Sequence, residues 1–165
     1  MELSKVAKPE QPSRPQRRLK VFTLEHANST LPLVSRIVSD IVRQHKKVCL
    51  LEEKYQVPGP RGSEEDRKAL GRRYAAELDV LCELRDELSA IGCQLKDWRR
   101  GLVDFLGRHQ GRPIEFCWRL GEARIQHWHE ADAGFRARQP IDEEFLAESL
   151  AAPLQTRATE SAAPD

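Results

Sequence analysis

The sequence predicts an α+β protein, mainly α with a small β part, in which a long antiparallel helical hairpin carries a short antiparallel β-meander. In two long stretches, about 31–56 and 64–100, apolar residues recur at spacings of three and four, as the buried face of a helix requires. Further along, apolar and polar residues alternate with a period of two, which is typical of strands. We therefore expect a single domain over residues 21–150, with the hairpin at about 24–100 and the meander at about 102–130.

The first helix is predicted to begin at Leu24, because Thr23 is a good N-cap residue. Pro32 disfavours helical backbone at the residue before it. We therefore expect a short helix over 24–30, a break or kink, and a long helix from about 31 to 56.

The second helix is predicted to begin after Ser63, an N-cap residue that three acidic residues follow. Gly101 ends the periodic stretch, which gives a helix over about 64–100. A short connection makes the two helices antiparallel neighbours. Their apolar stripes are wider than one partner helix covers, so we expect the protein to associate with itself as a dimer.

The meander is predicted from three short strands at about 102–106, 114–119 and 124–129. A two-residue turn of type II′ at Gly121-Glu122 is one way to join the last two strands. This register places Trp118 opposite Ile125, Phe116 opposite His127, and Ile114 opposite His129. A three-residue loop instead places Cys117 opposite His127 and Glu115 opposite His129, and the sequence leaves both registers open.

The two ends of the chain have too few apolar residues to offset the entropy of ordering them. We expect disordered tails at 1–20, which is basic and contains prolines, and at 151–165, which is rich in Ala, Pro, Thr and Ser. Between the meander and the second tail we expect a loop and a short helix over 131–149, capped by Asp142.

The composition argues against several classes of partner. With 27 Lys and Arg against 26 Asp and Glu, the net charge of +1 gives no general attraction for nucleic acid or for an anionic membrane. No apolar run approaches the roughly 18 residues of a membrane span, and the N-terminus lacks the apolar core of a signal peptide. We therefore expect a cytoplasmic protein that does not enter membranes, whose four cysteines are free thiols.

The candidate site lies between Cys117 and Pro140, where coordinating and hydrogen-bonding side chains are densest. Its members are Cys117, Trp118, Glu122, His129, Glu130, Arg138 and Gln139. His127 and His129 lie two apart, so both imidazoles point to one side of a strand. They would bind zinc or iron, with Glu130 and Asp104 among the further ligands. The alternative is that both histidines pack at the interface between sheet and helices.

A catalytic role is not favoured. Cys117 as a nucleophile needs a neighbouring base and a lowered pKa, and His127 is placed to serve only in the second register. The sequence has no glycine-rich phosphate loop, serine elbow or helical HExxH pair. The function that it favours is a non-enzymatic module that associates with itself or binds a partner. A metal-binding protein or metal-dependent enzyme is the alternative.

Three segments carry unusual sequence words: FTLEHANSTLPLVSRIVSDIV at 22–42, LKDWRRGLVDF at 95–105, and CWRLGEARIQHWHEADAGFRARQP at 117–140. Together they resemble a small prokaryotic family called domain of unknown function 2203, over about residues 21–141. The chain departs from that pattern at His26, where Glu is usual, and at Leu106, which is often Pro. The resemblance implies an architecture and no activity, because none is assigned to the family.

Overall fold

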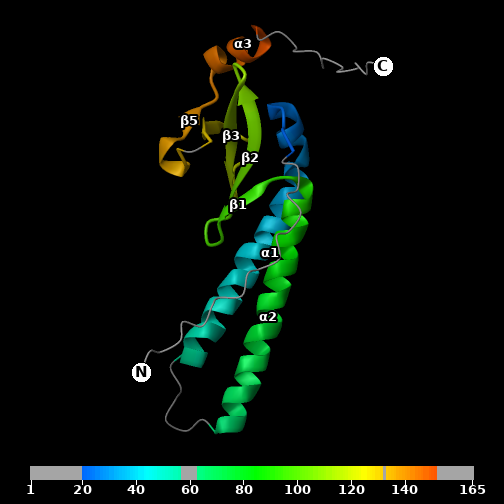
Figure 1. Ribbon diagram of the computed structural model, residues 1–165, viewed down its shortest axis with the longest axis vertical. Coiled ribbons are helices and arrows are strands. Elements are labelled where there is room, and N and C mark those ends of the chain that lie inside the picture. Colours follow the sequence, from blue (N-terminus) through cyan, green and yellow to red (C-terminus); the bar gives the residue numbers. More distant parts are fainter. Residues whose placement is uncertain (1–19, 57–62, 132, 152–165) are drawn as a thin grey trace, which may run out of the picture.

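The computed structural model describes residues 20–56, 63–131 and 133–151, in which a helical hairpin projects from one end of a small sheet (Figure 1). The hairpin consists of α1 (Leu24–Gln56) and α2 (Glu64–Ile91). This arrangement confirms the predicted fold class. The predicted tails lie outside the described residues, apart from Lys20 and Ala151. None of the helices in the described ranges has the length and apolarity needed to cross a membrane.

The sheet is antiparallel throughout, and its five strands lie side by side in the order in which the chain makes them. They are β1 (Gln94–Asp97), β2 (Leu102–His109), β3 (Arg112–Arg119), β4 (His127–Glu130) and β5 (Gln139–Pro140). A 3₁₀ helix, η1 (Phe135–Ala137), precedes β5, and α3 (Glu143–Ala151) follows it. The predicted cap of that last helix is present, because Asp142 Oδ1 accepts a hydrogen bond from Phe145 N at 2.9 Å.

Helix α1 is continuous through Pro32, so the predicted break near residue 31 is wrong. The proline removes one backbone donor, but Leu31 and Val34 on either side of it are buried in the core. This packing keeps the helix intact. The predicted start is confirmed, since His26 N donates to Thr23 Oγ1 at 3.2 Å.

Helix α2 ends at Ile91 and not near residue 100 as predicted. Gly92 stops it by adopting a left-handed conformation with φ of 107°, in which its N–H donates to Ser89 O. The next residues form β1 in place of the predicted last helical turns. Leu95 and Trp98 pack against the core from the strand and the turn after it, so the apolar spacing continues past the end of the helix.

The register between β3 and β4 is the second of the two that the sequence left open. Cys117 lies opposite His127 and Glu115 lies opposite His129. The two-residue turn at Gly121-Glu122 is wrong, because residues 120–126 all lie between the two strands. Ile125 is drawn away from β3: its side chain is buried in the core and its N–H donates to Asn28 Oδ1 at 2.9 Å.

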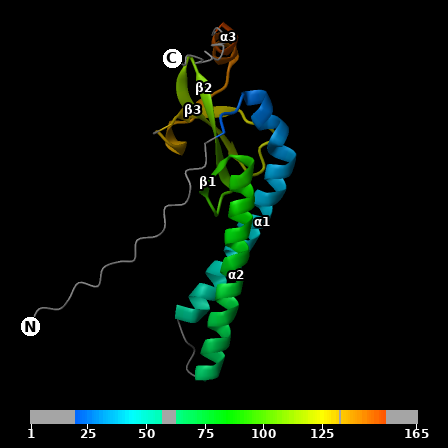
Figure 2. The same cartoon turned by 45° about the vertical axis from the view of Figure 1, so that its right-hand side comes forward.

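The core lies between α1 and one face of the sheet. Figure 2 shows the N-terminal half of α1 beside the sheet and its other half paired with α2 beyond the sheet. Apolar side chains of both layers are buried together, namely Phe22, Leu31, Val34 and Val38 with Val103, Phe105, Ile114, Phe116 and Trp118. In the hairpin, buried Gln44 donates from Nε2 to the carbonyl and carboxylate of Glu77 at 2.8 and 2.7 Å, which sets the register of the two helices.

A candidate metal centre on the sheet

The sheet face turned away from α1 carries the polar side chains. Because residues along a strand alternate between faces, the inward Val103 and Phe105 place Asp104 on the other side. The strand pairing sets Asp104 opposite Cys117 and Glu115 opposite His129. Three neighbouring strands therefore bring a carboxylate, a thiol and an imidazole to one place.

Arg138, which follows η1, ties the segment between β4 and β5 to this region of the sheet. Its Nη2 donates to Cys117 O at 3.0 Å and to the Glu122 carboxylate at 3.0 and 3.1 Å. Figure 1 shows that this segment turns back on the side of the sheet away from α1. Arg138 and Glu122 are themselves mostly buried, with 12% and 15% of their side chains exposed.

Glu122 accepts the hydrogen bonds from Arg138, and we call this pair the Glu122–Arg138 clamp. Burial disfavours its charge, but hydrogen bonds from Arg138 and from Arg119 N outweigh that effect and hold the pKa of Glu122 below its usual value. Its carbonyl oxygen accepts from Trp118 Nε1 at 2.9 Å. The loop after β3 is thereby fixed to β3 itself and to the returning segment.

His129 is fully buried, and its two ring nitrogens have different surroundings. Nδ1 lies 2.8 Å from Glu130 O, and since a carbonyl oxygen only accepts, Nδ1 must carry a proton. Nε2 has no hydrogen-bond partner and lies 3.3 Å from Asp104 Oδ2. Fixing the proton on Nδ1 by a backbone carbonyl is how proteins orient an imidazole whose Nε2 binds a metal.

Asp104 and Cys117 complete a compact group with His129. One potential ligand atom from each residue lies within 4.8 Å of the other two, and all three residues are buried. Oδ1 of Asp104 also lacks a hydrogen-bond partner. A buried polar atom without a partner lowers the stability of a folded protein by roughly 1–3 kcal/mol. Asp104 and His129 each carry one such atom.

Lys96 and Glu115 lie next to this group. The Lys96 ammonium is 3.0 Å from Glu115 Oε1 and 3.7 Å from Asp104 Oδ2. Glu115 Oε2 is 3.8 Å from His129 Nδ1. Burial raises the pKa of Glu115, and the charge of Asp104 adds to this rise, while Lys96 opposes both.

The arrangement does not activate Cys117 as a nucleophile. Burial raises the pKa of its thiol, and the neighbouring Asp104 carboxylate raises it further. A reactive cysteine needs a lowered pKa and access to its substrate, whereas this side chain is fully buried. Metal coordination would instead remove the thiol proton directly.

The remaining predicted site residues lie around this group. His127 is opposite Cys117 and its Nδ1 is buried without a partner, but it is not one of the three clustered residues. The Glu130 carboxylate lies 3.9 Å from Arg112 and only its carbonyl reaches His129. Gln139 of β5 pairs with Trp128 of β4, and its side chain is exposed.

Lys96 was not expected in the site, because the apolar period predicts a helix over about 64–100 that includes it. The signal was Gly92, whose left-handed conformation starts a new element. The β1–β2 register shifts between Leu95 and Asp97, so Lys96 is the extra residue of a bulge.

Comparison with known proteins adds a family and no activity. Residues 20–141 match a family described as "Uncharacterized conserved protein (DUF2203)". Neither the curated proteins nor the solved structures gave a significant match. The matched range includes α1, α2 and all five strands, and therefore every residue of the group just described.

Proposed function

The chain belongs to the DUF2203 family of uncharacterized conserved proteins, and on that premise we propose that it binds a divalent transition-metal ion, zinc in the first place, through Asp104, Cys117 and His129. The observation that carries this proposal is the pair of unpartnered atoms, Asp104 Oδ1 and His129 Nε2, in one buried group of three ligand types. An ion between the two side chains would be a partner for His129 Nε2 and would neutralise the buried Asp104 carboxylate.

The spacing supports tetrahedral coordination. Metal–nitrogen and metal–oxygen bonds of about 2.0–2.1 Å at the tetrahedral angle put two ligand atoms about 3.3–3.4 Å apart. His129 Nε2 and Asp104 Oδ2 are already 3.3 Å apart. The thiol needs a shift of at most about 1 Å, since the ligand atoms of the group all lie within 4.8 Å of one another. Mixed sulfur, nitrogen and oxygen ligands are typical of zinc and also suit ferrous iron.

The burial supports a structural ion more than a catalytic one. A catalytic zinc keeps an open position for water or substrate, whereas none of these three side chains is more than 3% exposed. The ion would cross-link β2, β3 and β4. Its binding energy would then add to the stability of the folded sheet.

Metal content and cobalt substitution test the proposal. Protein purified without a histidine tag is expected to contain zinc or iron in up to equimolar amount by elemental analysis. After chelation, cobalt(II) is expected to give the intense visible bands of a tetrahedral site and a sulfur-to-metal charge-transfer band. Cys117→Ser should remove the charge-transfer band, and His129→Ala should remove metal while leaving the far-ultraviolet circular dichroism spectrum unchanged.

The chain offers a matched control in His45 and Cys49. These two residues lie one turn apart on α1, with Cys49 Sγ 3.6 Å from His45 Nε2, and Cys49 is exposed. The variant Cys49→Ser should leave metal content and the cobalt spectrum as in wild type. Protein that holds no metal as purified and takes up none on titration contradicts the proposal.

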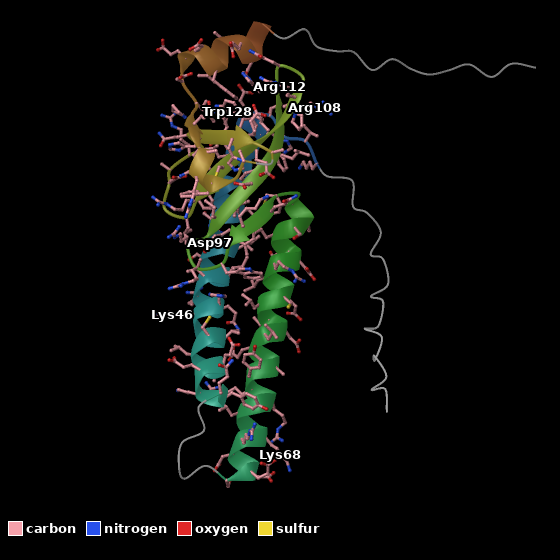
Figure 3. All side chains as sticks on the ribbon, turned by 60° about the vertical axis from the view of Figure 1, so that its left-hand side comes forward. Lys46, Lys68, Asp97, Arg108, Arg112 and Trp128 are labelled. Atoms are coloured by element: carbon pink, nitrogen blue, oxygen red, sulfur yellow. The ribbon has the colours of Figure 1, made fainter. Side chains whose placement is uncertain are left out.

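Self-association is a second candidate, supported by apolar residues left exposed on the hairpin. Leu50 is 50% exposed, and Leu78 and Val80 on α2 are 36% and 42% exposed. A groove of about 470 Å³ beside Leu50 is lined by Val42, His45, Lys46, Cys49, Glu53 and Arg99. It presents both signs of charge beside apolar surface, so the same groove on a second copy offers complementary partners. Figure 3 shows Lys46 on the part of the hairpin beyond the sheet.

A further inference from the structure

Lys96 is the cationic side chain closest to the proposed metal ligands. Among the ion pairs of the described residues, it is the one lysine or arginine that contacts Asp104 or Glu115. It therefore already supplies a positive charge to two carboxylates that are buried to 3% and 10% exposure of their side chains. Without it, His129 would be the ion-pair partner that remains for these carboxylates among the described residues.

A metal ion bound to Asp104 and the Lys96 ammonium at its present distance from Asp104 would repel each other. The ion would bind Asp104 Oδ2, from which the ammonium nitrogen is 3.7 Å away. A divalent ion about 2 Å from that oxygen would then lie within about 6 Å of a like charge. Like charges at this distance repel strongly in a site that excludes water.

Lys96 also has a route out. It is the extra residue of the bulge in β1, an edge strand, and 34% of its side chain is exposed although its partners are buried. A lysine has a long flexible stem, so its ammonium can reach water without moving the strand. When it leaves, Glu115 Oε1 loses its 3.0 Å partner.

We propose that Lys96 is a built-in competitor for the metal: its ammonium neutralises the Asp104 carboxylate in the metal-free protein, and metal binding displaces it toward solvent. This inference rests on the metal-binding function proposed above. It makes the affinity of the site depend on a residue that is not itself a ligand. The metal-free protein is then held together by an ion pair and the metal-bound protein by coordination.

Titration of metal-free protein with zinc, against a competing chromophoric chelator, tests the competition. Lys96→Met keeps the length of the side chain and removes its charge, and it should tighten zinc binding by about tenfold or more. The matched control is Lys46→Met, at an exposed lysine of α1, which should bind zinc as wild type does. Equal or weaker binding by Lys96→Met, with wild type binding zinc, overturns the competition and leaves the metal site standing.

Chemical labelling tests the displacement in the wild-type protein and does not depend on a variant that folds. Acylation of lysines followed by mass spectrometry should label Lys96 faster with zinc than without, and Lys46 equally in both. Labelling of Lys96 that zinc does not change overturns the displacement. If neither wild type nor Lys96→Met binds zinc, the metal-binding function itself is wrong. If only Lys96→Met binds, the metal-binding function of the wild-type protein is wrong although the competition is supported.

Discussion

The Nε2 atom of His129 lies 3.3 Å from Oδ2 of Asp104, although the two residues come from strands that are not neighbours. They meet across β3, because Asp104 is opposite Cys117 of β3 and His129 is opposite Glu115, two residues before Cys117 on that strand. Both side chains are almost fully buried. This diagonal contact sets what the sheet face can bind, and it leads to the first prediction.

Zinc should stabilise the protein against unfolding, and the effect should require the thiol of Cys117. Free zinc at about 100 times its Kd adds about 2.7 kcal/mol to the free energy of unfolding. Thermal denaturation with and without chelator measures this shift. Cys117→Ser should lose it. Cys93→Ser, at another buried cysteine, whose pKa is raised to about 12 by burial, should lower stability and keep the shift.

Leu88→Ala should lower the free energy of unfolding by about 2–5 kcal/mol, because this side chain is 1% exposed in the core and its loss leaves a cavity. The matched change Leu78→Ala, at a position 36% exposed on the same helix, should stay within about 0.5 kcal/mol. Urea denaturation of the two variants measures the difference. Equal losses would mean that the assigned faces of α2 are wrong.

Gly92→Ala should destabilise the protein by more than Gly121→Ala does. Both glycines have positive φ, 107° and 99°, so alanine costs about 1–2 kcal/mol at either position through backbone strain. At Gly92 the added Cβ also meets Lys20 Cβ at 2.8 Å, whereas nothing lies within 4 Å at Gly121. Urea midpoints compare the two, and a larger loss for Gly121→Ala would refute the role given to the close approach of Lys20.

The Glu122–Arg138 clamp should make stability depend on pH below about 4.5, the ordinary pKa of a glutamate. The pKa of Glu122 is lowered in the folded protein, so its contribution is present above that value and is lost as the pH falls through the folded-state pKa. Glu122→Gln should therefore be less stable than wild type at pH 7, and this gap should narrow in acid. Urea midpoints measured in chelator across the pH range test it, with Glu64→Gln, an exposed position, as control.

The hairpin should mediate dimer formation. Sedimentation equilibrium at tens of micromolar is expected to give about twice the mass of the 18.9 kDa chain. Leu50→Lys should give the mass of a single chain, because it replaces exposed apolar surface of the groove with a charge, while Leu146→Lys, at a position 43% exposed on α3, should not. A wild-type protein that sediments as a monomer with its helical content intact rules out this second candidate function.

Much of the architecture could be predicted because local patterns specify it. The period of three and four residues identified both helices, and Thr23, Ser63 and Asp142 marked helix starts that the structure contains. Two boundaries failed where a local rule and packing disagree. Helix α1 continues through Pro32 because the residues on either side of the proline are buried in the core. The end of α2 was predicted too late because the apolar spacing continues past Gly92.

The candidate site could be predicted only in part. The pairing of Cys117 with His127 was one of two open registers, because the choice depends on Ile125 bonding to Asn28, a contact between distant segments. Asp104 and His129 were expected among the metal ligands, and the structure brings them together. Glu130 points elsewhere, since adjacent residues of a strand face opposite sides of the sheet.

The order of the strands has a consequence for aggregation. In a sheet whose strands follow the chain, the first and last strands form the two edges, and here β1 has four residues with a bulge and β5 has two residues, one of them Pro140. Beyond the end of β1, Phe22 N donates a hydrogen bond to Leu106 O of β2 at 2.7 Å, so the backbone at Phe22 covers a further part of the β2 edge. Short, bulged or proline-bearing edges are poor templates for a strand from another molecule. A strand from another molecule therefore finds little free edge to pair with on either side of this sheet.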